Sequence, residues 1–260
     1  ASAPASFGSE HTDRRDKVQS ERASQTIKVD FSKPIGVIRH LHDIHSGPLA
    51  WRGAIDLSSY YSDLGIKFIR LHDSPWVYKD VVDIDYIFPR FEADVDNPDN
   101  YVFEQSDEYI GEMKAGGFEM IYRLGYSADV SARHNVPPSD FGKWASVCAN
   151  IARHYNDGWA NGYHHNIRYW EIWNEPDIQN FWKGTREEYF QLYEATARAL
   201  KTVDPSLKTG GPATASAAKD NAFMDAFLKY CKERQIPLDF CSWHMYRAKP
   251  YELCESAIGV

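Results

Sequence analysis

Apolar positions along the chain recur with two spacings, every second residue in some segments and every third or fourth residue in others. The first spacing is typical of strands and the second of helices that face a core. Strands are predicted over residues 35–41, 67–73, 118–124, 167–173, 207–211 and 238–244. Helices are predicted over residues 56–65, 106–115, 139–155, 186–203 and 220–234. Ser139 is the expected N-cap of the third helix, and Thr185 with Glu188 forms a capping box for the fourth.

Strands and helices therefore alternate, which predicts an α/β protein with a parallel sheet. Polar residues gather after successive strands, as they do at the carboxyl-terminal, active face of a (β/α)8 TIM barrel. A closed barrel of this type needs eight strands, and six are found, so we expect the chain to supply strands 1–6. Open sheet edges leave backbone groups unpaired and apolar faces uncovered. A second polypeptide, from the same precursor or separate, is therefore predicted to complete the barrel.

The barrel is assigned to residues 35–260, and two shorter segments precede it. Residues 1–25 are small and charged with few large apolar groups, which predicts a disordered tail. Residues 26–34 begin with an apolar and polar alternation, which predicts an accessory strand. A start without Met is what signal-peptidase cleavage leaves, so we expect a secreted or extracellular protein, although an artificial boundary would look the same.

The composition limits the classes of molecule that this chain is expected to bind. A net charge of -8 without a basic cluster argues against nucleic acid, and no apolar run approaches the roughly 20 residues of a membrane span. Aromatic residues make up 14% of the chain, and their rings can stack on the C–H faces of sugars, although many will serve the core. Four cysteines, Cys148, Cys231, Cys241 and Cys254, show no C-x-x-C spacing, which leaves buried thiols or one disulfide. No phosphate-binding glycine motif is present, so no nucleotide is expected.

The strongest local motif lies at the end of the fourth predicted strand, where Trp173 is followed by Asn174, Glu175 and Pro176. Hydrolysis of a glycoside needs a carboxylic acid that protonates the leaving oxygen, and Glu175 is placed for that task. Asn174 offers a neutral donor to a sugar hydroxyl, most usefully the 2-hydroxyl. The alternative is that Glu175 is a surface carboxylate that caps a nearby helix.

This motif resembles the acid/base strand of clan A glycoside hydrolases. The longer stretch of residues 154–177 resembles glycoside hydrolase family 39, which includes β-xylosidases and α-iduronidases. Further segments share the resemblance: Arg70-Leu71-His72, Arg123-Leu124-Gly125, Gly210-Gly211-Pro212 and Ser242-Trp243-His244.

The resemblance implies a retaining glycosidase with Glu175 as general acid/base and Asn174 as the partner of the 2-hydroxyl. It implies that Arg70 holds a nucleophile ionised and that His72 and His244 bind sugar hydroxyls. Tyr246 would border the same carbohydrate site, and Trp173 is included among its substrate-binding residues.

In that family a second glutamate, at the end of the seventh strand, attacks the anomeric carbon, and no residue here corresponds to it. Retention needs two carboxyl groups about 5 Å apart. Glu171 is a poor substitute, because it lies four residues earlier on the same strand, roughly 13 Å away. Two functions stay open: one part of a retaining glycosidase, or a catalytically silent barrel that binds glycans or serves as a structural subunit.

His40 and His42 share one face of the first predicted strand, as do the metal ligands of amidohydrolase barrels. Those barrels also need a bridging ligand on strand four, where this chain has Asn174 and Glu175, so neither a metal nor another cofactor is expected. His42, with Asp43 or His45 as further candidates, is assigned to the sugar subsite. The alternative is that these are loop histidines without a ligand.

Overall fold

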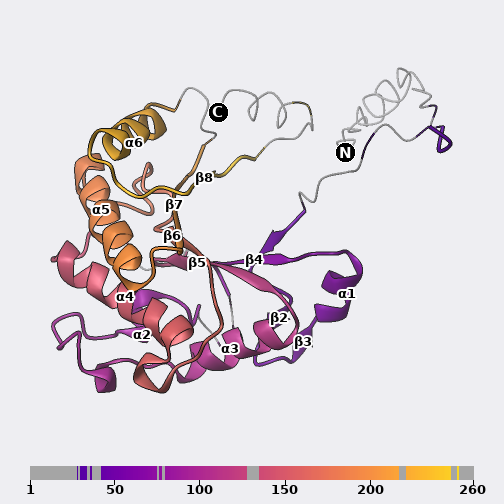
Figure 1. Cartoon of the computed structure of the whole chain (residues 1–260), viewed down its shortest axis with the longest axis horizontal. Coiled ribbons are helices and arrows are strands. Elements are labelled where there is room, and N and C mark those ends of the chain that lie inside the picture. The colour runs from indigo at the N-terminus through magenta and orange to yellow at the C-terminus, as the bar shows by residue number, and fades with distance from the viewer. Residues whose placement is uncertain are drawn as a thin grey trace, which may run out of the picture. The chain divides into compact units, whose positions relative to one another are not determined.

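Six parallel strands form the main sheet, in the order β1-β4-β5-β6-β7-β8 (Figure 1). Their bounds are Ile44–His45 for β1, Phe68–Leu71 for β4, Glu119–Leu124 for β5, Tyr169–Ile172 for β6, Lys208–Thr214 for β7 and Phe240–Trp243 for β8. The sheet curls into part of a (β/α)8 barrel, as the sequence predicts. A separate antiparallel pair, β2 (Leu49–Ala50) with β3 (Ile55–Asp56), follows β1.

This computed structural model describes residues 28, 30–33, 36, 42–74, 76–77, 80–127, 135–216, 221–246 and 251. The chain divides into two units, Ala1–Leu41 and His42–Val260, and the sheet belongs to the second. In the first unit, Phe31 and Ser32 form a turn, and the Lys33 N–H donates to the Asp30 carbonyl at 3.2 Å. The predicted tail, 1–25, and most of the strand predicted over 35–41 lie outside the described residues. Of the predicted accessory strand, 26–34, residues 28 and 30–33 are described and none of them is in a strand, because the chain turns at Phe31 and Ser32.

Helices connect the strands and cover the outer side of the sheet (Figure 1). The α-helices are α1 (Ser58–Asp63), α2 (Ile84–Ile87), α3 (Glu104–Ala115), α4 (Phe141–Asp157), α5 (Arg186–Val203) and α6 (Ala222–Glu233). Two short 3-10 helices are η1 (Pro98–Asn100) and η2 (Trp159–Asn161). Within the described residues, no helix combines the length and apolar character that a membrane crossing requires.

Local caps set the ends of the two long helices, α4 and α5. The Thr185 hydroxyl accepts from the Glu188 N–H at 3.2 Å while the Glu188 carboxylate accepts from the Thr185 N–H at 2.6 Å, so the predicted capping box is confirmed. The prediction of Ser139 as N-cap of α4 is wrong by one residue. The Asp140 carboxylate fills that role, because it accepts from the Lys143 N–H at 2.9 Å.

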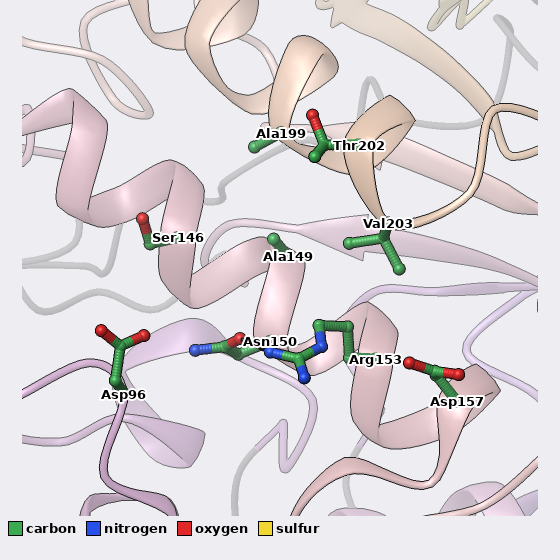
Figure 2. A pocket seen from close by; sticks show the side chains of 9 residues that line it. All are labelled: Asp96, Ser146, Ala149, Asn150, Arg153, Asp157, Ala199, Thr202 and Val203. Carbon is green, nitrogen blue, oxygen red and sulfur yellow. Dashed lines mark hydrogen bonds between the residues drawn. The ribbon is translucent and has the colours of Figure 1, made fainter.

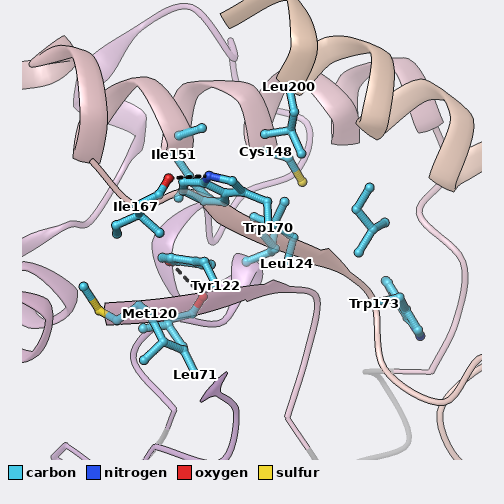
Figure 3. Packing of buried hydrophobic residues seen from close by; sticks show 14 of the residues in the cluster. Leu71, Met120, Tyr122, Leu124, Cys148, Ile151, Ile167, Trp170, Trp173 and Leu200 are labelled. Atoms are coloured by element: carbon cyan, nitrogen blue, oxygen red, sulfur yellow. Dashed lines mark hydrogen bonds between the residues drawn. The ribbon is translucent and has the colours of Figure 1, made fainter. Parts of the chain in front are cut away.

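The core between sheet and helices is rich in aromatic residues (Figure 3). Tyr122 of β5 stacks on Trp170 of β6 with ring centroids 4.9 Å apart, and both rings are fully buried. The Trp170 indole N–H donates to the Ile167 carbonyl at 2.9 Å, so this large ring leaves no polar atom unpaired. Packing of this kind fixes β5 and β6 relative to each other, and β6 carries the candidate acid.

Helix α1 departs from its predicted packing. Helical spacing places Tyr60 and Tyr61 of α1 on one face with the flanking Leu57 and Leu64, yet no residue of α1 is buried. Tyr61 alone packs inward, edge-on against Phe118 at 6.3 Å, whereas Tyr60 and Leu64 are 65% and 64% exposed. A helix of six residues has too short a face to bury all of these side chains on one neighbour.

Candidate active site

The candidate site lies at the carboxyl ends of β4, β6 and β8, which the parallel pairing brings to one edge of the sheet (Figure 1). Arg70 comes from β4, Asn174 and Glu175 follow β6, and His244 follows β8. Hydrogen bonds connect these side chains in two groups, one around Arg70 and one around Glu175.

Arg70 is the centre of the first group. Its Nε donates to a Glu171 carboxylate oxygen at 2.6 Å, and its second guanidinium nitrogen donates to Asn174 Oδ1 at 2.8 Å. The Glu171 side chain is 2% exposed and that of Arg70 is 14% exposed, so the pair is shielded from water. Because a guanidinium can only donate, Asn174 must turn its oxygen toward Arg70, and its amide NH2 is left to donate elsewhere.

The backbone after β6 is strained in a way that aims Glu175. Trp173 has a φ of 73° and Glu175 a φ of 49°, both in the left-handed region, which costs about 1–3 kcal/mol per residue. The Trp173 N–H donates to the Leu124 carbonyl of β5 at 2.7 Å, and the Glu175 N–H donates to the Ala213 carbonyl of β7 at 2.9 Å. Strands on both sides of β6 therefore hold this turn in place.

Glu175 and His244 form the second group. Glu175 is 9% exposed, and His244 Nδ1 lies 2.5 Å from its Oε1. The His244 N–H donates to the Thr214 carbonyl at 2.7 Å, which extends the pairing of β8 with β7 up to the site. When Glu175 is ionised, the Nδ1–H of His244 can donate to it, and when Glu175 is protonated, its O–H can donate to Nδ1. A carboxyl group with such a partner can give and regain a proton.

His72 lies beside these groups and is 4% exposed. Its Nδ1 accepts from Arg123 Nε at 3.0 Å. Burial, then the charges of Arg123 and Arg70, hold the pKa of His72 far below its usual range, so its ring is neutral. The ring of His45, which pairs in register with Arg70, lies 5.9 Å from the His72 ring.

A model of the family described as glycosyl hydrolases family 39 matches residues 15–258. The chain belongs to this family. It is 32% identical over 203 residues to a beta-xylosidase of Geobacillus stearothermophilus, a match that covers 72% of the chain and 37% of that relative. It is 30% identical over 209 residues to a beta-xylosidase of Caldicellulosiruptor saccharolyticus, covering 75% of the chain and 39% of the relative.

Among solved structures, the crystal structure of a glucosidase from Croceicoccus marinus matches with a TM-score of 0.71 and 31% identity. That match covers 82% of this chain and 45% of the other. This family 39 chain therefore spans less than half the length of each of these three relatives.

Two predicted substrate-binding residues of this family 39 chain, Trp173 and His42, direct their side chains away from Glu175. The Trp173 ring is 2% exposed and packs in the core, edge-on to Trp182 at 4.9 Å, because the left-handed backbone turns it outward from the barrel axis. His42 Nε2 lies 2.8 Å from the Leu64 carbonyl, ahead of β4 and so at the amino end of the sheet. Tyr246 follows β8 with its side chain 83% exposed.

A buried cluster of charged side chains behind His72 is not among the features predicted from the sequence. One guanidinium nitrogen of Arg123 donates to Asp83 at 2.6 Å, to Asp80 at 3.3 Å and to the Ser127 hydroxyl at 3.0 Å. Burial raises the pKa of Asp83 to about 7, with Arg123 opposing that rise and Asp80 adding to it. The clue in the sequence is Arg123 itself, since an arginine within an apolar strand needs buried carboxylates, and two follow β4 three residues apart.

The described residues include three of the four cysteines and most of the side chains considered as metal ligands. Among the described residues, no three His, Cys, Asp or Glu side chains come together to hold a metal ion, and His40 lies outside that part of the chain. Cys148, Cys231 and Cys241 are free thiols. Cys254 also lies outside the described residues.

A hollow of about 540 Å³ on the helical layer is unconnected with this site (Figure 2). It lies between α4 and α5, and its lining consists of Asp96, Ser146, Ala149, Asn150, Arg153, Asp157, Ala199, Thr202 and Val203. The carboxyl halves of these helices lead into the amino ends of β6 and β7. The hollow therefore lies toward the end of the sheet opposite Glu175.

Proposed function

We propose that the protein containing this chain is a retaining glycoside hydrolase with Glu175 as its general acid/base. The observation that carries the proposal is the position of Glu175, a shielded carboxyl group at the end of a barrel strand, 2.5 Å from His244. In the first step Glu175 protonates the leaving glycosidic oxygen, and in the second it takes a proton from the attacking water. His244 holds the carboxyl group in place during both steps.

Asn174 is proposed to bind the 2-hydroxyl of the sugar. Its Oδ1 is occupied by Arg70 at 2.8 Å, so the amide presents its NH2 to the substrate in a fixed orientation. A hydrogen bond to the 2-hydroxyl strengthens as the transition state forms, which places this contact where it lowers the barrier. Arg70 thereby acts on the substrate through Asn174.

The proposed substrate is a neutral pyranoside, with a β-xyloside as the first choice. Two of the relatives are beta-xylosidases and one solved relative is a glucosidase, and both names denote uncharged sugars. The guanidinium groups of Arg70 and Arg123 are each paired with carboxylates, so neither is left to bind the carboxylate of a uronide. His72 and His244 then bind sugar hydroxyls.

A second carboxyl group is required about 5 Å from Glu175. We propose that further polypeptide, either covalently continuous with this chain or a separate subunit, brings this nucleophile and completes the barrel. Exposed apolar side chains at α1 support the proposal, because Tyr60 and Leu64 are 65% and 64% exposed and further polypeptide would cover such apolar surface.

Replacement of Glu175 by Gln in the whole protein tests the assignment. Hydrolysis of an unactivated xyloside should fall by about 10²- to 10⁴-fold, because general acid catalysis is lost. An aryl xyloside with a good leaving group should lose much less in its first step. Glu187→Gln, which changes an exposed carboxylate at the start of α5, is the matched control and should leave both rates unchanged.

Undiminished hydrolysis by Glu175→Gln would reject the role of this residue. If the wild-type protein binds xylo-oligosaccharides and hydrolyses none, the alternative of a catalytically silent glycan-binding barrel is the correct one.

A further inference from the structure

The contact between Arg123 and His72 fixes the tautomer of the imidazole as well as the position of its ring. A guanidinium Nε–H can only donate, so His72 Nδ1, 3.0 Å away, must be an unprotonated acceptor. A neutral imidazole with a bare Nδ1 carries its proton on Nε2. His72 therefore has one tautomer available, with Nε2–H as its donor.

Arg123 is itself held so that it cannot turn away. Its side chain is fully buried, and its Asp80 and Asp83 partners are 2% and 8% exposed in their side chains. The Ser127 hydroxyl contacts both carboxylates, and the Ser127 N–H donates to Asp83 at 2.9 Å. The cluster joins the loop after β4 to the end of β5, and it leaves Arg123 Nε directed at His72.

We propose that Arg123 is a positioning residue that locks His72 as the Nε2–H tautomer, so that His72 serves the sugar site as an obligate hydrogen-bond donor. The inference rests on the proposed glycosidase function only for the identity of the acceptor, a sugar hydroxyl oxygen. The tautomer follows from the contacts of this chain alone.

Burial and the positive charges near His72 oppose its protonation, whereas one carboxylate, that of Asp73, favours it. The charges of Arg123 on β5, Arg70 on β4, His45 on β1 and His244 after β8 all lower the pKa of His72 and so disfavour the doubly protonated ring. On the other side, Asp73 Oδ2 lies 3.6 Å from Nε2, on the atom that already carries a proton. His72 should stay neutral from about pH 5 to pH 8, whereas an unperturbed histidine titrates within that range.

The test is ¹⁵N NMR of histidine side chains in the labelled whole protein, with the His72 signals identified by their loss in His72→Gln. Two-bond correlations between ring nitrogens and carbon-bound protons distinguish the two tautomers and the imidazolium. Wild-type His72 should show the Nε2–H pattern at every pH between about 5 and 8. In Arg123→Lys, which keeps the charge but lacks the Nε–H, His72 should titrate or populate the Nδ1–H form.

Kinetics supply the second readout. A glutamine amide at position 72 can place a donor where Nε2 lies, whereas asparagine reaches only the Nδ1 position. His72→Gln should therefore keep more of kcat/KM on the xyloside than His72→Asn, by about three- to tenfold, the value of one hydrogen bond. This comparison stands even if Arg123→Lys fails to fold.

An Nδ1–H signal or a titration of His72 in the wild-type protein would overturn the proposal. So would an unchanged Nε2–H signal in folded Arg123→Lys, or activity of His72→Asn equal to that of His72→Gln. A wild-type protein with the Nε2–H pattern and no hydrolysis of any glycoside would instead refute the proposed function and leave the tautomer assignment standing.

Discussion

The pair formed by Arg70 and Glu171 should be among the strongest electrostatic interactions in this part of the barrel. Glu171 lies on β6 with its side chain 2% exposed, and Arg70 lies on β4 with 14% exposed. The two are joined at 2.6 Å, and Arg70 also donates to Asn174. Removing one member leaves the other charge shielded from water and without its partner.

The expected magnitude follows from this burial. Loss of one member of a fully buried ion pair costs about 3–5 kcal/mol, whereas exposed pairs contribute about 0–1 kcal/mol. Glu171→Gln keeps the shape and one acceptor, and Arg70 retains some access to water, so we expect a loss of about 2–3 kcal/mol in unfolding free energy. Arg70→Met strands a carboxylate with almost no exposure, so we expect about 3–5 kcal/mol.

A double-mutant cycle measures the interaction itself. Urea unfolding of wild type, Glu171→Gln, Arg70→Met and the double variant should give a coupling energy of about 2 kcal/mol or more. The control is Lys229 with Glu233 on α6, 3.8 Å apart and 74% and 63% exposed, whose coupling should stay below about 0.5 kcal/mol. A coupling for Arg70 and Glu171 no larger than that of the control would refute the reasoning.

Three further predictions concern the framework of the site. Thr185→Ala should lower the unfolding free energy by about 1 kcal/mol in urea, through loss of the capping box, and no loss would mean that the cap is not formed. Gly210→Ala should lower the melting temperature strongly, since the added Cβ would lie 2.5 Å from the Phe240 carbonyl oxygen. Gly111→Ala, in open space within α3, should instead raise the unfolding free energy by up to about 1 kcal/mol, and equal changes in melting temperature for the two variants would contradict this reasoning. The pKa of Asp83 is raised to about 7, so the folded state keeps the Asp83 proton at pH values where the unfolded state has released it, and the unfolding free energy should fall as the pH rises from about 4 to about 7. Asp83→Asn should flatten this pH dependence of the unfolding free energy, and an unchanged slope would exclude Asp83 as its source.

Much of the framework could be predicted because its determinants are local. Helix α5 begins and ends at the predicted residues, since Thr185 and Glu188 cap one end and Asp204-Pro205 follows the other. Strands β4 to β8 lie within or close to their predicted segments, because the spacing of apolar residues in each strand differs from the helical spacing of the neighbouring helices. These signals reside within a few residues of each element.

The candidate site was less accessible to prediction because it depends on long-range pairing. The Asp43 carboxylate accepts from the N–H groups of Lys67 and Phe68, which sets where the chain joins β4, and nothing near Asp43 in sequence encodes that partner. The same pairing places His45 beside Arg70 and leaves His42 at the other end. Trp173 adjoins Glu175 in sequence, yet its left-handed backbone sends the ring into the core.

The central claim is that Glu175 is the acid/base of a retaining glycosidase. Its most direct test is azide rescue of Glu175→Ala in the whole protein with an activated aryl xyloside. Without a base, water attacks the glycosyl-enzyme intermediate slowly, whereas azide needs no base and attacks at once. The account predicts that azide restores turnover and yields the glycosyl azide with the configuration of the substrate. Turnover of Glu175→Ala that equals the wild type, or that azide leaves unchanged, would contradict it.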